Sequence, residues 1–196
     1  MKSAQFVVAA VLGLGILQAV SQTPAIDSAL KAKADAGDPA AEVSVGESYA
    51  KAAGAASDPE TAADGWNKAA EWYAKAAAQS YVPAEIHLAD CYSYGRGVTR
   101  DKGKAAEWYR KAADHDDARA QGTLAMLYTM GQGVPQDDAE AYFWFDLAAS
   151  ADTPNKERYL INRQNVGTRI TADQLAAVQQ RLKKWKAAHP HADAVK

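Results

Sequence analysis

Residues 68–80 read KAAEWYAKAAAQS and residues 104–116 read KAAEWYRKAADHD, so nearly the same thirteen residues occur twice, 36 positions apart. A looser third copy, EAYFWFDLAASAD, begins another 36 positions on, at Glu140. A fixed period of this length is typical of proteins built by stacking one small structural unit. The spacing therefore predicts a repeat array.

A second phrase precedes each copy: AEVSVGESY from Ala41, AEIHLADCY from Ala84 and AQGTLAMLY from Ala120. In the middle unit both phrases have the periodicity of an amphipathic helix. The apolar positions are Ala84, Leu88, Ala89 and Tyr92 in the first phrase and Ala105, Trp108, Tyr109, Ala112 and Ala113 in the second. Each unit is therefore predicted to be a pair of helices that buries its apolar faces against neighbouring units.

The turn between the two helices is marked by paired glycines, in GRGV at 95–98 and in GQGV at 131–134. Glycine turns the chain at low steric cost. Asp101 and Asp137 follow these turns, where each is predicted to be the N-cap of the second helix.

These phrases resemble the Sel-one-like repeat (SLR) family, which is related to tetratricopeptide repeats. The resemblance is close over 84–149 and looser before it, and it implies an all-α fold: a right-handed α-solenoid of stacked helix-turn-helix repeats. The segment ITADQLAAVQQRLKKW at 170–185 resembles the C-terminal capping helix of bacterial members. Thr171 and Gln174 are expected to form its capping box, with Leu175, Val178, Leu182 and Trp185 as its apolar stripe.

The predicted organisation divides the chain into seven parts. They are a secretory signal at 1–21, an N-terminal capping helix at 22–37, a degenerate repeat at 38–81, repeats at 82–117 and 118–151, a linker and C-terminal capping helix at 152–188, and a tail at 189–196. In the degenerate repeat, Tyr49 and Trp72 are 23 residues apart, against 16 for Tyr92 and Trp108. The seven extra residues are predicted to form a mobile surface loop around 54–61.

The composition excludes several classes of function. The 196 residues carry 22 Lys plus Arg against 24 Asp plus Glu, a formal net charge of −2, so no nucleic-acid partner is expected. Lys2, the apolar run at 6–20 and the small residues Ala19 and Ser21 predict an export signal that is cleaved, in preference to an uncleaved anchor. The predicted location is the bacterial periplasm or the exterior, with no membrane span after cleavage.

Residues that could carry catalysis are sparse. Cys91 is the single cysteine, so no internal disulfide can form, although exported relatives often pair cysteines within each unit. It is interpreted as a small buried packing residue. The histidines, which are His87, His115, His189 and His191, are not spaced for a metal or a catalytic triad. No enzyme activity, cofactor or metal is predicted.

A binding surface is predicted on the first helix of each unit, opposite its core stripe, on the concave side of the solenoid. Positions 3, 6 and 10 from the motif alanine share that face, and their chemical character changes from unit to unit. We call these nine residues the predicted stripe: Ser44, Glu47, Lys51, His87, Asp90, Tyr94, Thr123, Met126 and Met130. Alternatively, these residues form a solvated face, or the C-terminal helix covers the two methionines.

The leading functional hypothesis is a non-catalytic, monomeric scaffold or adaptor that binds another protein or peptide. The resemblance also implies two alternatives. One is an immunity protein that neutralises a secreted, type VI-like effector such as a phospholipase. The other is a cell-envelope enzyme that acts on penicillin or peptidoglycan, for which no nucleophile and base stand at a suitable spacing.

Overall fold

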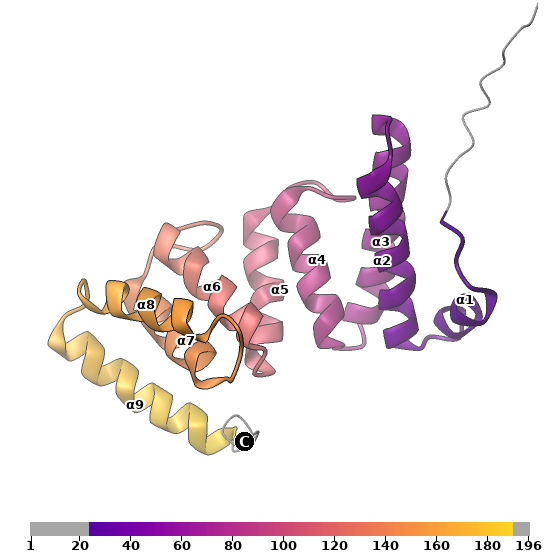
Figure 1. The fold of residues 1–196 in the computed structure, drawn as a ribbon. Helices are drawn as coiled ribbons and strands as arrows, with labels where there is room; N and C mark the ends of the chain where they lie inside the picture. Colours follow the sequence, from indigo (N-terminus) through magenta and orange to yellow (C-terminus); the bar gives the residue numbers. More distant parts are fainter. Residues whose placement is uncertain (1–23, 190–196) are drawn as a thin grey trace, which may run out of the picture.

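The computed structural model describes residues 24–189, so the predicted signal and the tail beyond His189 lie outside the described residues. Within that range the chain forms nine α-helices and no strand, which confirms the all-α prediction (Figure 1). The helices are α1 (Ser28–Asp35), α2 (Pro39–Ala55), α3 (Pro59–Ala77), α4 (Val82–Tyr94), α5 (Lys102–Asp114), α6 (Ala118–Met130), α7 (Asp138–Ser150), α8 (Lys156–Gly167) and α9 (Ala172–Ala188).

The helices pack in chain order from α1 at one end of the molecule to α8 and α9 at the other (Figure 1). Within units α2 packs on α3, α4 on α5 and α6 on α7, while α3–α4 and α5–α6 contacts join the units. About half of the buried apolar residues are alanines, whose small side chains let neighbouring helices approach closely. The stacked array predicted from the period is confirmed.

Aspartates begin most of the helices. Their carboxylates accept hydrogen bonds from backbone N–H groups of the first turn, as an N-cap requires. The capping residues are Asp27, Asp38, Asp58, Asp101, Asp117 and Asp137, for α1, α2, α3, α5, α6 and α7 in turn. The predicted caps at Asp101 and Asp137 are confirmed, as is the capping box of Thr171 and Gln174 at the start of α9.

The paired glycines have a second role that the sequence did not reveal. Gly97 has φ +71°, and a Cβ placed on it would lie 2.0 Å from the carbonyl oxygen of Trp66, in the preceding unit. Gly133 has φ +77° and stands equally close to the carbonyl oxygen of Lys102, 36 residues after Trp66. Each turn therefore packs its second glycine against the backbone of the unit before it, where no side chain fits.

The predicted mobile loop at 54–61 is wrong. Helix α2 continues to Ala55 and α3 begins at Pro59, so only residues 56–58 connect them. The extra residues lengthen these helices to 17 and 19 residues, against 13 in each helix of the next two units. The extension buries Gly65 against Ala53, where an added Cβ would lie 2.8 Å from the alanine Cβ. This close helix contact supplies the burial that a loop would lack.

The prediction that Trp108 belongs to the core is only partly right. Its ring is half-buried, with the Lys111 ammonium 3.6 Å from the ring centroid. The following residue, Tyr109, is fully buried. In the next unit the equivalent Trp144 is 1% exposed, because α9 brings Trp185 edge-on to its ring at 5.4 Å.

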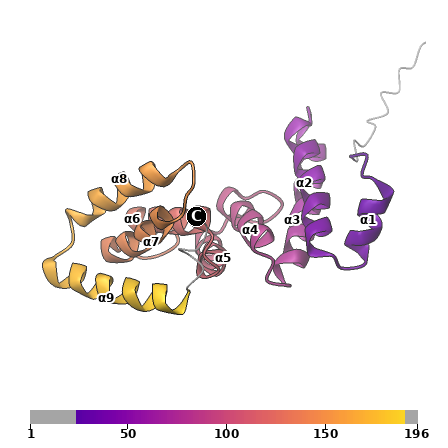
Figure 2. The same ribbon diagram turned by 60° about the horizontal axis from the view of Figure 1, so that its bottom comes forward.

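The C-terminal segment contains one more helix than predicted, because α8 lies in the region interpreted as a linker. Figure 2 shows α8 and α9 on opposite sides of the α6–α7 pair, and both pack on α7. Acidic residues of α7 hold them: Asp146 accepts from Arg163 of α8 at 2.5 Å, and Glu140 accepts from Arg181 of α9 at 2.5 Å. Val178 and Leu182 of α9 are buried, as predicted, while Leu175 and Trp185 are half-buried.

Candidate protein-binding surface

The first helices of the units form one continuous surface. Glu47 on α2 lies 3.3 Å from His87 on α4, and Asp90 on α4 lies 2.6 Å from Arg119 on α6. The Asn162 amide on α8 lies 3.7 Å from the Met126 sulfur on α6. Residues of the predicted stripe therefore meet neighbouring helices across three successive seams, from α2 to α8.

A pocket of about 230 Å³ lies at the α2–α4 seam. Glu47, His87 and Asp90 of the predicted stripe line it, together with Trp66, Tyr73 and Arg96 among others. The His87 imidazole stacks on the Tyr73 ring with centroids 4.6 Å apart, while its Nε2 faces the Glu47 carboxylate. These two contacts fix the histidine ring in the wall of the pocket.

Cys91 also lines this pocket, but its environment does not favour a nucleophile. Burial raises the pKa of its thiol to about 11, with a further contribution from the nearby Asp90 carboxylate. A catalytic cysteine needs the opposite shift, because the thiolate is the reactive form. The thiol is therefore protonated at neutral pH, and the interpretation of Cys91 as a buried packing residue is confirmed.

Asp90 is a structural junction as well as a surface residue. It accepts hydrogen bonds from the Tyr109 hydroxyl of α5 and from the Arg119 guanidinium of α6. Burial is the main reason that the pKa of the Tyr109 hydroxyl is raised, and its hydrogen bond to Asp90 raises it further. Asp90 thus ties the first helix of one unit to both helices around it.

A second cleft, of about 340 Å³, lies between α6 and α8. It is lined by Arg119, Gly122, Thr123, Met126, Asn155, Arg158, Tyr159 and Asn162. The floor is close-packed, because a Cβ on Gly122 would lie 2.2 Å from the Tyr159 ring. Thr123 and Met126 of the predicted stripe are thus brought together with residues of α8.

Apolar side chains of the predicted stripe remain exposed. Tyr94 is 64% exposed, Met130 48% and Met126 37%, and with Ile161 they are the large apolar side chains that stand most open among residues 24–189. Helix α8, not α9, lies beside Met126 and leaves it open. The alternative in which the C-terminal helix covers the methionines is therefore wrong.

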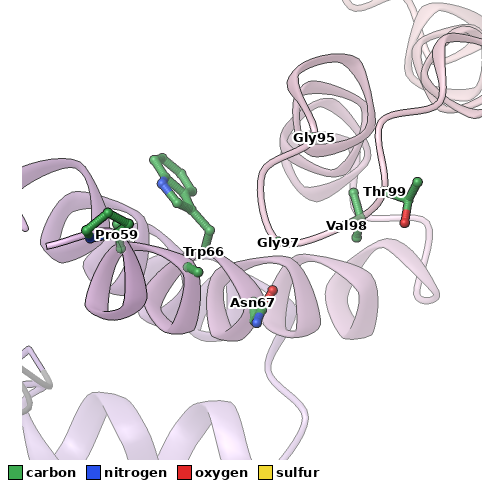
Figure 3. A pocket seen from close by; sticks show the side chains of 9 residues that line it. Pro59, Trp66, Asn67, Gly95, Gly97, Val98 and Thr99 are labelled. Atoms are coloured by element: carbon green, nitrogen blue, oxygen red, sulfur yellow. The ribbon is translucent and has the colours of Figure 1, made fainter.

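A third pocket, of about 740 Å³, opens beside the stripe, where α3 faces the turn between α4 and α5 (Figure 3). Trp66 projects from α3 beside Gly95 and Gly97 of that turn. The Arg96 guanidinium lies 4.7 Å from the Trp66 ring centroid and 5.0 Å from that of Tyr94. The cation therefore links an exposed stripe residue to the edge of this pocket.

The structure does not gather the whole stripe into one site. Ser44 is half-buried and donates to the Ala40 carbonyl, Lys51 is exposed, and neither lines a pocket described above.

The sequence did not predict four parts of this surface, which are Trp66, Arg96, Arg119 and the α8 residues. Arg119 lies one position before the motif alanine Ala120, and the segment of α8 was interpreted as a linker. Neither belongs to the motif positions from which the stripe was predicted.

The His, Cys and acidic side chains of residues 24–189 bear on metal binding, and the helices of the same range bear on membrane crossing. That part of the chain contains no cluster of three or more His, Cys, Asp or Glu side chains suited to a metal ion. Nor does any of its helices have the length and apolarity to cross a bilayer. His189 stacks on Trp185 with centroids 4.2 Å apart, and His191 lies outside the described residues.

Comparison with known proteins identifies the repeat. The Sel1 repeat model matches residues 67–81, 82–117 and 118–152. The chain therefore contains three Sel1 repeats. Proteins with Sel1 repeats generally mediate protein–protein interactions and are typically non-catalytic. No curated protein matches the chain.

Two similar solved structures support the fold. One is a protective antigen of uropathogenic Escherichia coli with an SLR fold, 27% identical over 84% of this chain, with a TM-score of 0.61. The other is a Sel1 repeat protein from Oxalobacter formigenes, 31% identical over 60% of this chain, with a TM-score of 0.52. The chain spans 41% and 46% of the lengths of these two proteins.

Proposed function

We propose that this Sel1-repeat protein is a non-catalytic scaffold that binds a segment of another protein along the surface of α2, α4, α6 and α8. The observation that carries the proposal is the exposure of Tyr94, Met126 and Met130 on that surface. Large apolar side chains gain by leaving water, and aromatic side chains dominate many binding interfaces. Methionine adds a flexible contact that adapts to the shape of a partner.

Tyr94 and Met130 support the proposal most directly, because they occupy equivalent positions in successive units. Each is the last residue of its helix, directly before a left-handed glycine cap at Gly95 or Gly131. A bound segment that crosses the units can therefore contact both side chains. Neither is buried in the repeated core, so their removal is expected to leave the fold intact.

The test compares the wild-type protein with a Tyr94→Ala, Met130→Ala double variant as bait in periplasmic extract. We expect a protein that the wild type captures and the variant does not, with circular dichroism and melting temperature nearly unchanged. A Lys183→Ala, Lys184→Ala variant, altered at exposed residues of α9, is the control and should capture normally. Equal capture by both variants would place the binding surface elsewhere.

We further propose that the protein acts in the periplasm or outside the cell, on the basis of the apolar run at 6–20 and the small residues Ala19 and Ser21 at its end. Fusion of residues 1–21 to alkaline phosphatase lacking its own signal tests this, since that reporter is active only after export. An inactive fusion would contradict the location.

An immunity protein is a special case of the proposed function. Identification of the captured partner as a secreted effector, such as a phospholipase, would establish that special case.

A further inference from the structure

Beside Met126 and Tyr159, the cleft between α6 and α8 is lined by several side chains that can donate hydrogen bonds. Guanidinium groups come from Arg119 and Arg158, amides from Asn155 and Asn162, and a hydroxyl from Thr123. No carboxylate lines it, whereas the α2–α4 pocket contains the carboxylates of Glu47 and Asp90. The charged groups that line the α6–α8 cleft are therefore all cationic, whereas the α2–α4 pocket carries both signs because Arg96 also lines it.

Several donors of this cleft lack matching acceptors within the described part of the chain, although the Thr123 hydroxyl donates to the Arg119 carbonyl at 2.8 Å. Arg158 is exposed and forms no ion pair there; its guanidinium lies 5.7 Å from the centroid of the Tyr159 ring. The Asn162 amide donates only to the Met126 sulfur, a weak acceptor. Arg119 bonds Asp90 through Nη2 but remains 58% exposed, which leaves other N–H groups accessible.

Resting on the proposed function, we infer that this cleft binds an acidic side chain of the partner segment, while an adjacent apolar side chain packs on Met126. A carboxylate supplies the acceptor oxygens that the guanidinium and amide groups need. The acidic side chain of the segment therefore lies at α6–α8, where the cleft lining contains two guanidinium groups and no carboxylate.

The test uses random dodecapeptides displayed on phage and selected on the purified wild-type protein. We expect the selected peptides to carry Asp or Glu next to a large apolar residue. Each selected peptide is then synthesised in two forms, with Glu or with Gln at the acidic position, and the Kd of both forms is measured on wild type and on an Arg119→Ala, Arg158→Ala double variant.

On the wild type, the Gln form is expected to bind about tenfold more weakly or worse, as loss of a hydrogen bond to a charged group predicts. On the double variant the two forms should bind alike, because the partner of the carboxylate is gone. Lys156→Ala, on the same helix as Arg158 but outside the cleft lining, removes one positive charge and should preserve the discrimination. Arg158→Lys should retain part of it, since the charge remains but the planar fork is lost.

Two results separate this inference from the proposed function. Peptides without acidic residues that bind the wild type but not the Tyr94→Ala, Met130→Ala variant would overturn the acidic-ligand inference and leave the binding surface in place. A Gln penalty of equal size on the wild type and on the arginine variant would also overturn it. Peptides unaffected by any of these variants, or no selected peptide at all, would contradict both.

Discussion

The first unit of the array and the two units after it reach the same packing by different means. In the later units, helices of 13 residues are joined by turns that begin GRGV and GQGV and that contact the preceding unit. In the first unit, helices of 17 and 19 residues are joined by residues 56–58 and extend the α2–α3 pair beyond the stack (Figure 1). The core positions Ala69, Tyr73 and Ala76 remain buried as in their counterparts.

This difference shows that the repeat conserves its apolar seam and not its helix length. The extension is stable because Gly65 and Ala53 are both small and buried against each other. It also displays Trp66 beside the turn of the next unit, next to Arg96. The irregular unit thus adds surface at the edge of the binding face without disturbing the stack.

The largest effect is expected from tryptophan removal in the last unit. Trp144→Ala should lower the free energy of unfolding by about 3–5 kcal/mol, the usual cost of deleting a buried aromatic. Trp108→Ala should cost only about 1–2 kcal/mol, because part of the side chain is already in contact with water. Urea titration of both variants measures this. Equal losses would mean that the two units are packed alike and that α9 adds nothing.

Gly97→Ala is the next largest and tests whether the glycine turn joins the units. The alanine Cβ would meet a backbone carbonyl at 2.0 Å and sit at a positive φ, so we expect a loss of about 2 kcal/mol or more. Gly37→Ala is the matched control, because Gly37 has φ +88° with open space around its Cβ position. Its loss should be about 1 kcal/mol, from backbone strain alone. Thermal and urea unfolding measure both losses. Equal stabilities of the two variants would mean that the contact of Gly97 with the preceding unit contributes nothing.

A third prediction compares one buried position across all three units, occupied by Glu42, Glu85 and Gln121. The Gln121 amide donates to the Ala113 carbonyl at 3.2 Å, and Glu42 accepts from Gln79 at 2.9 Å. In Glu85, Oε2 is buried without a hydrogen-bond partner, and burial raises the pKa of the carboxyl. Glu85→Gln should therefore raise the melting temperature at neutral pH.

The pH dependence of this gain follows from the direction of the shift. Because the folded-state pKa of Glu85 is raised, the wild type loses stability as pH rises through the titration of the carboxyl. The advantage of Glu85→Gln should thus be largest at neutral pH and vanish at acid pH, where the carboxyl is protonated in both states. Glu42→Gln, whose carboxylate already has a donor, is the control and should give no gain. A gain that does not change with pH would contradict a buried charge as the cause.

The smallest effect concerns the start of the long helix α3. Asp58 accepts from the Thr61 backbone N–H at 2.8 Å, and hydrogen bonds from Thr61 lower the pKa of its carboxyl. Asp58→Ala should lower the melting temperature slightly at neutral pH. Since the folded pKa is lowered, the wild type loses this contribution as pH falls through the carboxyl titration, and the two proteins should converge in acid. No difference at neutral pH would favour a loop at 54–61 after all.

The sequence alone determined the repeat, its period, the helical faces and the N-caps at Asp101 and Asp137. These depend on local chemistry: the periodicity of apolar residues along one helix and the hydrogen bonds of one helical turn. The stripe residues Tyr94, Met126 and Met130 were predicted for the same reason, since positions opposite the core face of a helix point outward. Their exposure required no knowledge of other units.

Only the tertiary structure decided how the units meet. Whether Trp108 or Trp144 is buried depends on which helix lies over the ring, and α9 reaches only the second. The inserted residues are helical because Gly65 of α3 packs against Ala53 of α2. These residues are 12 positions apart and lie in separate helices. The α6–α8 cleft likewise combines Arg119 with Arg158, from segments whose periodicity says nothing about each other. Local patterns fix each helix, and packing between helices fixes the surface that a partner meets.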